Sequence, residues 1–277
     1  MINITASIVL YHNNKEQLKR AIKSFLDTTL NVKLYLIDNS SNDNLKELEK
    51  IDERIEYIFN NANLGYGKAH NIAMRKTIDS NIPYHIVLNP DIYFGNGILE
   101  ELFEYMDNDN TIGHIMPKVL YPDGKLQHLT KMLPTPIDLI FRRFIPLKKW
   151  KEKKAYKYEL RFSGYNIIAN VPYLSGCFMF LKTAALKDIG MFDERFFMYP
   201  EDIDLTRRIH KKYKTIYYPN VSIVHEHEKA SFKNFKMMKI HMWNMIKYFN
   251  KWGWFFDSER KEFNEQILKE LNYKVKK

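Results

Sequence analysis

The sequence predicts an α/β fold with a mostly parallel sheet flanked by helices, and three observations support this prediction. β-rich apolar segments alternate with helical patterns through the first ninety residues, as they do in doubly wound sheets. Clusters of Asp and Asn directly follow these segments, and such sheets bind ligands at the carboxyl ends of their strands. A chain of 277 residues that is 45% hydrophobic can bury a large core. We expect one α/β domain followed by a helical tail.

The first half contains four predicted strands and two predicted helices. The strands are expected at residues 4–11, 32–37, 55–59 and 84–88. One helical pattern runs from residue 15 to about residue 30, and a second helix is expected after Asn71, up to about residue 80. Because strands and helices of this length alternate, the strands should pair in parallel.

Each polar cluster after a strand has two interpretations. Asp38 opens the run DNSSNDN, which is either a turn or a contact to a ribose or base. The glycines of residues 63–71 permit a tight turn or a close approach of backbone to a ligand. Asn89-Pro90-Asp91 either ends a buried strand or supplies an oxygen ligand for Mg²⁺ or Mn²⁺ that bridges two phosphates.

Motifs and composition argue against several classes of protein. The chain has no GxGxxG after the first strand and no GxxxxGK[ST], which disfavours a Rossmann dehydrogenase and a P-loop NTPase. It also lacks Cys/His zinc spacing, and its single cysteine rules out an internal disulfide and fits a reducing compartment. No signal peptide and no apolar run of about 20 residues is visible. The net charge of +10 indicates anionic partners: nucleotide phosphates, nucleic acid or an acidic membrane surface.

The second half is less regular. Residues 133–165 mix proline, basic and aromatic residues without clean periodicity, so we expect an insertion that is mobile or ordered only with a partner. Its KKWKEKK run is either solvated or in contact with anionic lipid. Residues 171–181 should form one buried strand in which Ser175-Gly176 allows close approach to a substrate. A helix is expected at 183–190.

A further strand is expected at residues 215–224, and His225 directly follows it. His225 is a surface residue, a phosphate contact or a metal ligand. Because side chains alternate along a strand, His225 and His227 should point to opposite sides, and at most one of them should face a site. We prefer His225, because it would be held more rigidly.

Asp202 occupies an unusual place on a helix predicted to begin near Pro200. At 100° per residue it lies at the start of the face that should pack inward, whereas Asp204, Arg207 and Arg208 lie on the opposite, solvated face. An inward carboxylate at a helix N-terminus is kept ionised by the helix dipole, as a general base requires. The alternative is an aspartate that caps the helix.

Seven motifs between Ser7 and Ser231 resemble, in the same order, those of family 2 glycosyltransferases of the GT-A fold, in particular the bacterial rhamnosyltransferase-like branch that builds polysaccharides. The motifs are SIVLYHN, DNSSND, NLGYGKAHN, LNPD, LSGCFMFLK, GMFDERFFMYPEDIDLTRRI and VHEHEKAS. The resemblance implies an inverting transfer of a sugar from a nucleotide diphosphate donor, dTDP-rhamnose or a UDP-sugar. The acceptor would be a hydroxyl of a lipid-linked saccharide in the synthesis of cell-surface polysaccharide.

The resemblance also assigns roles to residues. Asp202 matches the aspartate that deprotonates the acceptor, and Asp91 matches the last position of a DXD-type metal motif in which Asn89 replaces the first carboxylate. It implies a divalent metal, Mg²⁺ or Mn²⁺, held by Asp91 and His225, and support of the acceptor by Ser175, Gly176 and Glu201. The implied contacts to the nucleotide-sugar donor are Val9, Tyr11, Asp38, Asn63, Gly65, Lys68, Asn71, Asn89 and Asp91.

Two other functions stay open on the residues alone. A sugar nucleotidyltransferase should carry a Gly-rich basic loop after the first strand, where this chain has only Tyr11-His-Asn-Asn. A basic nucleic-acid-binding protein would explain the charge, but Asp and Asn at the strand ends repel phosphates unless a cation intervenes. We therefore expect no specific nucleic-acid partner.

Residues 1–231 should form the catalytic domain, with a nucleotide-sugar half up to about residue 115 and an acceptor half after it. Residues 232–277 should form a helical extension, because Met, Trp, Phe and Lys recur at helical spacing. These helices should pack on their own domain; the alternative is an interfacial membrane anchor built on Trp252, Trp254, Phe255 and Phe256. We expect a cytoplasmic protein, with contact to the inner face of the plasma membrane as an alternative that stays open.

Overall fold

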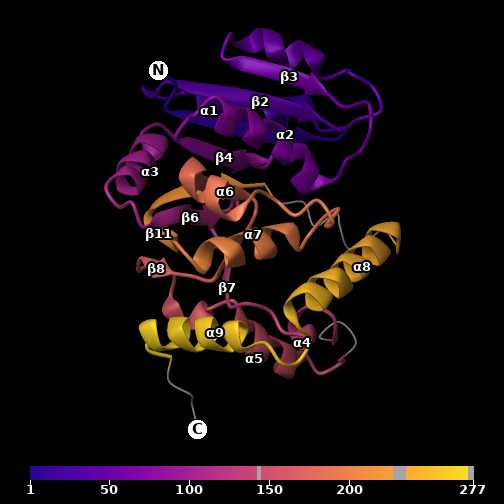
Figure 1. Ribbon diagram of the computed structural model, residues 1–277, viewed down its shortest axis with the longest axis vertical. Coiled ribbons are helices and arrows are strands. Elements are labelled where there is room, and N and C mark those ends of the chain that lie inside the picture. Colours follow the sequence, from indigo (N-terminus) through magenta and orange to yellow (C-terminus); the bar gives the residue numbers. More distant parts are fainter. Residues whose placement is uncertain (142–144, 227–234, 274–277) are drawn as a thin grey trace.

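The computed structural model describes residues 1–141, 145–226 and 235–273, and a nine-stranded sheet runs through its centre (Figure 1). Four strands pair in parallel at one side, and β10 then runs antiparallel between β4 and β6. The path is β3 (Ile55–Phe59), β2 (Val32–Asp38), β1 (Ile4–Leu10), β4 (Tyr84–Leu88), β10 (Phe178–Lys182), β6 (Ile112–Leu120), β11 (Lys214–His225) and β5 (Ile92–Tyr93), with β8 (Ala169–Asn170) paired to β11. The predicted mostly parallel sheet is confirmed.

Helices cover both faces of the sheet, so its central strands are apolar almost throughout. α1 (Lys15–Leu26) and α3 (Ile98–Asp107) pack on the face that carries Ile4, Ala6 and Ile8. The opposite face is covered by α2 (Tyr66–Asp79), α6 (Thr183–Ile189) and α7 (Glu201–His210). A short 3₁₀ helix, η1 (Lys46–Ile51), precedes β3.

The four strands and two helices predicted for the first half are present, with two shifted ends. α1 ends at Leu26 rather than about residue 30. α2 begins at Tyr66 rather than after Asn71, because Gly65 has a φ of +84° and supplies the turn that starts the helix. The glycine-rich motif therefore contains the first turn of the helix instead of preceding it.

The single strand predicted at residues 171–181 is wrong. The chain forms β9 (Tyr173–Leu174), which pairs with β7 (Thr130–Lys131), and then turns before β10 begins at Phe178. Gly176 lies in this turn, where its N–H donates to Asp202 and its carbonyl accepts from Tyr66. These two bonds replace strand pairing at Gly176.

The expectation of a mobile insertion at residues 133–165 is wrong for its described part. It contains α4 (Pro136–Leu139), α5 (Lys148–Tyr158) and a 3₁₀ turn, η3 (Arg161–Ser163). Tyr158 is buried, and Leu160 and Tyr165 are buried in one cluster with Ile267 of the C-terminal region. The insertion therefore shares a core with Met116 of β6, Tyr217 of β11 and a segment a hundred residues further along the chain.

The C-terminal region forms α8 (Phe235–Trp252) and α9 (Ser258–Glu270), which pack on the rest of the chain (Figure 1). Met245, Tyr248 and Phe249 of α8 are buried in one cluster with Leu133 and Ile203. The predicted helical tail is confirmed, and its expected start at residue 232 lies outside the described residues. Among the residues that are described, no helix is both long and apolar enough to cross a membrane.

Candidate active site

A cavity of about 550 Å³ opens where β4, β9, β11 and α7 meet. It brings together six residues that the sequence predicted for the site: Asn89, Ser175, Gly176, Glu201, Asp202 and His225. The first follows β4, the last ends β11, and the two carboxylates begin α7. Residues from distant parts of the chain therefore converge on one space, as expected at the carboxyl ends of strands in an open α/β sheet.

Asp202 is buried in the first turn of α7 and accepts three hydrogen bonds. Its Oδ2 accepts from the N–H of Gly176 at 2.8 Å and from the hydroxyl of Tyr173 at 3.3 Å, and Oδ1 accepts from the N–H of Ile203 at 2.8 Å. These donors and the charge of Lys131 lower the pKa of Asp202, but burial outweighs them and raises it overall. The dipole alone does not keep this carboxylate in its usual pKa range.

Glu201 lies beside Asp202, and its Oε2 is buried without a hydrogen-bond partner among the described residues. Burial, and then the negative charge of Asp202, raise the pKa of Glu201 to about 8. Asp202 has side-chain oxygens that accept three hydrogen bonds, whereas Glu201 has an orphaned oxygen. When one proton is shared between the two groups, Glu201 holds it and Asp202 is the ionised carboxylate.

Asp91 and His225 face each other at 3.3 Å between Oδ1 and Nε2. Gln127 fixes the histidine: its Nε2 donates to the carbonyls of His225 and Leu120, so its Oε1 must accept from Nδ1 of His225, 3.0 Å away. The Nε2 lone pair of a neutral His225 then points at a buried carboxylate oxygen that accepts no hydrogen bond within the described residues. Two acceptors in this position require a proton or a cation between them.

Asn89 is bound to Tyr66, whose hydroxyl lies 2.9 Å from Oδ1 of Asn89 and 2.7 Å from the carbonyl oxygen of Gly176. A hydroxyl donates one proton, so it cannot satisfy two acceptors fully. An amide turned by 180° would donate from Nδ2 to the Tyr66 oxygen and leave the Tyr66 proton for Gly176. That orientation satisfies both contacts and frees Oδ1 of Asn89, a residue that lines the cavity, from the Tyr66 hydroxyl.

The residues assigned to the donor lie in two groups, of which Asn89 and Asp91 after β4 form one. Val9, Tyr11, Asp38, Asn63 and Gly65 lie at or just after the ends of β1 and β2 and before α2. Asp38 is fully buried, and it accepts from the hydroxyl of Tyr57 at 2.5 Å and from the N–H of Ser40 at 2.8 Å. Asp38 therefore forms a turn at the predicted place, and its contact to a ribose or base stays a prediction.

Two other predicted donor residues, Asn71 and Lys68, contact the segment before α7 instead of the cavity. The side-chain amide of Asn71 exchanges hydrogen bonds with the N–H and carbonyl of Phe192 and donates to Glu194. Lys68 is exposed and lies 3.9 Å from Glu194. Asn71 therefore ties α2 to the segment before α7, and its amide is already occupied within the protein.

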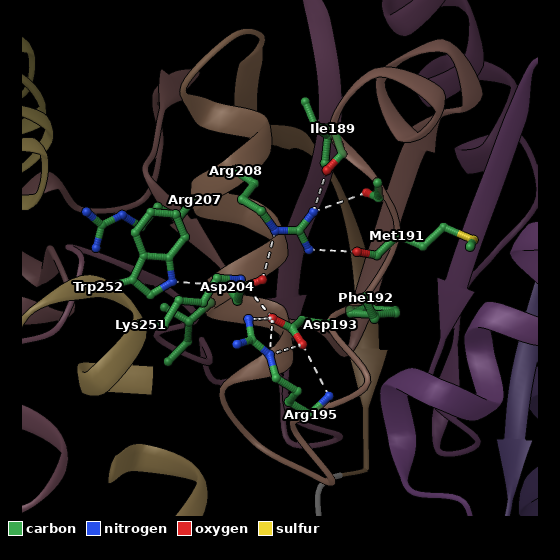
Figure 2. A network of polar contacts seen from close by, with 12 residues as sticks. Ile189, Met191, Phe192, Asp193, Arg195, Asp204, Arg207, Arg208, Lys251 and Trp252 are labelled. Carbon is green, nitrogen blue, oxygen red and sulfur yellow. Dashed lines mark hydrogen bonds and ion pairs between the residues drawn. The ribbon is translucent and has the colours of Figure 1, made fainter. Parts of the chain in front are cut away.

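The outer face of α7 is not solvated, contrary to the expectation for Asp204 and Arg207. Figure 2 shows Asp204 against Arg208, Lys251 and Trp252. Its Oδ2 lies 2.8 Å from Nε of Arg208, and its Oδ1 lies 2.5 Å from Nζ of Lys251 and 2.8 Å from Nε1 of Trp252. Arg207 donates to Asp257 and Glu259 and stacks on the Trp252 ring. The predicted pair of Asp204 and Arg208 is confirmed, but the C-terminal helices cover it.

Sequence reasoning missed four residues of the site. Tyr66 stands inside a recognised motif, but its role depends on the turn at Gly176. Gln127 and Tyr173 act on His225 and Asp202 from segments with no motif of their own. Arg161 lines the cavity from the insertion that was expected to be mobile. The motif around Tyr66 and the charge of Arg161 were signals in the sequence, whereas Gln127 and Tyr173 gave none.

The fit for a divalent cation rests on Asp91, His225 and Asn89. Their atoms are a buried carboxylate oxygen, an imidazole nitrogen and an amide oxygen. The two oxygens suit Mg²⁺ or Mn²⁺, whereas the imidazole nitrogen favours the transition metal Mn²⁺ over Mg²⁺. Among the described residues, no group of three or more His, Cys, Asp or Glu gathers into a complete metal site. A cation here would need oxygen atoms from a substrate as well, which is how Mg²⁺ is held on phosphates.

Comparison with known proteins identifies the chain's relatives. The model of the family described as glycosyl transferase family 2 matches residues 7–190. An N-acetylglucosaminyl-diphospho-decaprenol L-rhamnosyltransferase of Mycobacterium tuberculosis is 27% identical over 240 residues, 81% of this chain and 76% of that protein. The rhamnosyltransferase WbbL of Escherichia coli is 24% identical over 251 residues, 87% of this chain and 90% of that protein.

Solved structures show the same fold at low identity. GalNAc-T7, solved with UDP, GalNAc and Mn²⁺, superposes with a TM-score of 0.63 at 14% identity; the match covers 98% of this chain and 57% of that one. The mannosyltransferase PcManGT of Pyrobaculum calidifontis, in complex with GDP-Man and Mn²⁺, gives 0.59 at 14% identity and covers 98% and 70%. This fold is the GT-A fold. With two thirds of its length matched by the family model, the chain belongs to glycosyltransferase family 2, in its rhamnosyltransferase-like branch.

Proposed function

We propose that this glycosyltransferase moves a sugar, with inversion, from dTDP-rhamnose or a UDP-sugar to a hydroxyl of a lipid-linked saccharide in the synthesis of cell-surface polysaccharide. The observation that carries the proposal is the convergence of Asp202 and His225 on one cavity, with Asp91 directly behind His225 at 3.3 Å. The names of the rhamnosyltransferases of Mycobacterium tuberculosis and Escherichia coli support transfer of rhamnose, and that of the Mycobacterium tuberculosis enzyme supports a lipid-linked acceptor.

The reaction needs a base on one side of the sugar and stabilisation of the leaving group on the other. Asp202 takes the proton of the acceptor hydroxyl while the oxygen of that hydroxyl attacks the anomeric carbon of the donor sugar. The bond from that carbon to the diphosphate breaks, and the nucleoside diphosphate leaves with the bonding electrons. Tyr173, Gly176 and Ile203 hold the Asp202 carboxylate in place through the three hydrogen bonds.

Asp91, His225 and Asn89 would hold a divalent cation. Such a cation offsets the negative charge that develops on the diphosphate as it leaves. Within the protein, Gln127 keeps the proton on Nδ1 of His225, and Tyr66 holds Asn89 next to the turn that carries Gly176. The donor side and the base are thus connected through one hydroxyl.

The test is a transfer assay with dTDP-rhamnose and UDP-sugars, a polyprenyl-diphosphate saccharide as acceptor, and Asp202→Asn beside Glu201→Gln. We expect Asp202→Asn to lower the rate of transfer by about 10²–10⁴-fold, the range for a general base, and to leave nucleotide binding intact. Glu201→Gln should retain transfer, because Glu201 is the protonated partner. Retention of the anomeric configuration in the product, read by NMR, would overturn the proposal, because a retaining transfer needs a nucleophilic carboxylate instead of a base.

A further inference from the structure

We propose that the surface formed by α5 and the α8–α9 loop docks the enzyme on an anionic lipid bilayer. This inference rests on the proposed function, because a lipid-linked acceptor would reach the cavity from that bilayer. The lysine–phenylalanine face, as we name this surface, consists of Lys153, Lys154, Lys157, Phe255, Phe256 and Lys261.

The phenylalanines are the most unusual part of this face. Phe256 is 97% exposed and Phe255 is 73% exposed, next to each other in the loop before α9. Single exposed aromatics are common, but an adjacent pair beside a cluster of lysines matches the composition of interfacial membrane anchors. Their rings cover part of a groove of about 670 Å³ that is also lined by Lys157 and Lys261. The aromatic and basic side chains therefore share one surface.

The positive charge is concentrated here and is not neutralised by the fold. Residues 145–161 hold seven Lys and Arg against two Glu, so this stretch accounts for half of the net charge of +10. Lys157 lines the groove, and Lys153 and Lys154 precede it by four and three residues on α5. Residues at these spacings are neighbours on a helix surface, so Lys153 and Lys154 lie on the side of α5 that borders the groove. None of these three forms an ion pair within the part of the chain that the structure describes. Their charges remain available to anionic headgroups.

The face adjoins the active-site cavity. Lys131 lines the cavity and Met132 lines the groove, so neighbouring residues of one segment separate the two spaces. The end of α5 does the same, with Glu159 on the cavity and Lys157 on the groove. In Figure 1, α4, α5 and the loop between α8 and α9 lie together at the end of the molecule away from β1, β2 and β3. An acceptor anchored in a bilayer at this end would lie beside the segments that separate the groove from the cavity with Asp202.

The charge pattern favours lipid over nucleic acid as the partner. A single-stranded nucleic acid also binds lysines and aromatic side chains, but its backbone lies along a positively charged groove. The groove here carries Asp257 and Glu265 besides its lysines, so it is not uniformly positive. Two adjacent phenylalanines that are 73% and 97% exposed in one loop suit insertion between lipid headgroups. We therefore commit to an anionic bilayer.

The experiment is co-flotation of the full chain with vesicles, without substrates. Vesicles of phosphatidylcholine are compared with vesicles that contain about one third phosphatidylglycerol, at low and high salt. Wild type should float with the anionic vesicles at low salt and be released at high salt. Phe255→Ser/Phe256→Ser and Lys153→Gln/Lys154→Gln should each weaken partitioning by about tenfold or more.

Matched controls place the effect on this face. Trp243→Ser removes a 61% exposed aromatic elsewhere on α8, and Lys46→Gln/Lys50→Gln removes two exposed lysines from η1. Both controls should bind vesicles like wild type, and all variants should keep the wild-type thermal unfolding. Equal loss in the controls, no binding to anionic vesicles, or binding to a DNA duplex in preference to them would overturn the proposal. If only the docking proposal is wrong, the protein should still bind nucleotide and transfer sugar to a water-soluble acceptor. If the proposed function is wrong, neither activity should be measured.

Discussion

At the scale of single residues, the site depends on hydroxyl and amide groups that orient the charged ones. Tyr66 connects Asn89, on the donor side, to Gly176, whose N–H binds the base. Gln127 orients His225 in the same way. A charged residue in this cavity therefore has its direction set by a neutral neighbour, and removal of one hydroxyl should affect the donor side and the base together.

Tyr66→Phe tests this connection, because it removes only the hydroxyl. We expect a loss of transfer of about tenfold, in the range for one lost buried hydrogen bond, and a higher metal concentration for half-maximal rate. The measurement is the transfer rate against the concentration of Mn²⁺. Tyr84→Phe is the control, since it removes a buried-ring hydroxyl that bonds Asp107. A Tyr66→Phe enzyme with the wild-type metal dependence would show that the hydroxyl only contributes to packing.

Glu201 should give the ligand-free protein a distinct dependence of stability on pH. Its pKa is raised from 4.5 to about 8 on folding, so the folded state binds more protons than the unfolded state between these values. The stabilisation from protonated Glu201 is therefore present at low pH and is lost as pH rises through about 8. Glu201→Gln should gain in Tm relative to wild type between about pH 5 and pH 8. A difference in Tm that stays constant across this range would contradict the raised pKa.

At the scale of elements, α7 is held from both sides. Its inner face carries the two carboxylates of the cavity, and its outer face is joined to the C-terminal helices through Asp204 and Arg207 (Figure 2). Arg208 also donates to the carbonyls of Ile189 and Met191, which lie just before the loop that leads into α7. The C-terminal helices thus stabilise the element that positions the base.

Asp204→Ala tests the outer face. Asp204 is fully buried, and its removal leaves the N–H of Trp252 without its partner and takes a carboxylate from Arg208 and Lys251. Because Lys251 keeps its pair with Asp193, we expect a loss of about 3 kcal/mol in the free energy of unfolding, the low end for a broken buried ion pair. The measurement is denaturant unfolding. Asp188→Ala, which breaks a solvent-exposed pair with Lys212, should cost less than about 1 kcal/mol. Equal costs for the two variants would contradict the buried network.

Local sequence patterns predicted the elements but not their long-range contacts. The strand ends at Asp38, Asn89 and His225 followed from periodicity and turn chemistry, because both are properties of neighbouring residues. Asp204 was placed in solvent because a helical wheel contains no information about Trp252, 48 residues later. The break at Gly176 depends on bonds to Tyr66 and Asp202, which no local pattern reveals.

At the scale of the whole molecule, both halves of the chain contribute residues to one cavity and its surroundings. The first half supplies Asn89 and Asp91 at the end of β4, and the second half supplies Asp202 and His225. The insertion and α8 also line the cavity, through residues such as Arg161 and Met238. Both predicted halves therefore supply residues to the cavity. We propose that residues 232–277 are required for the catalytic domain to fold.

The central claim is that this cavity binds a nucleoside diphosphate with a divalent cation at Asp91. Calorimetric titration of UDP and dTDP, with and without Mn²⁺, into wild type and Asp91→Ala tests it most directly. Asp123→Ala, at an exposed turn, is the control. We predict that one nucleotide binds with Mn²⁺ and at least about tenfold more weakly without it, and that this difference disappears in Asp91→Ala. Absence of binding by either nucleotide, or a metal dependence that survives in Asp91→Ala, would contradict the account.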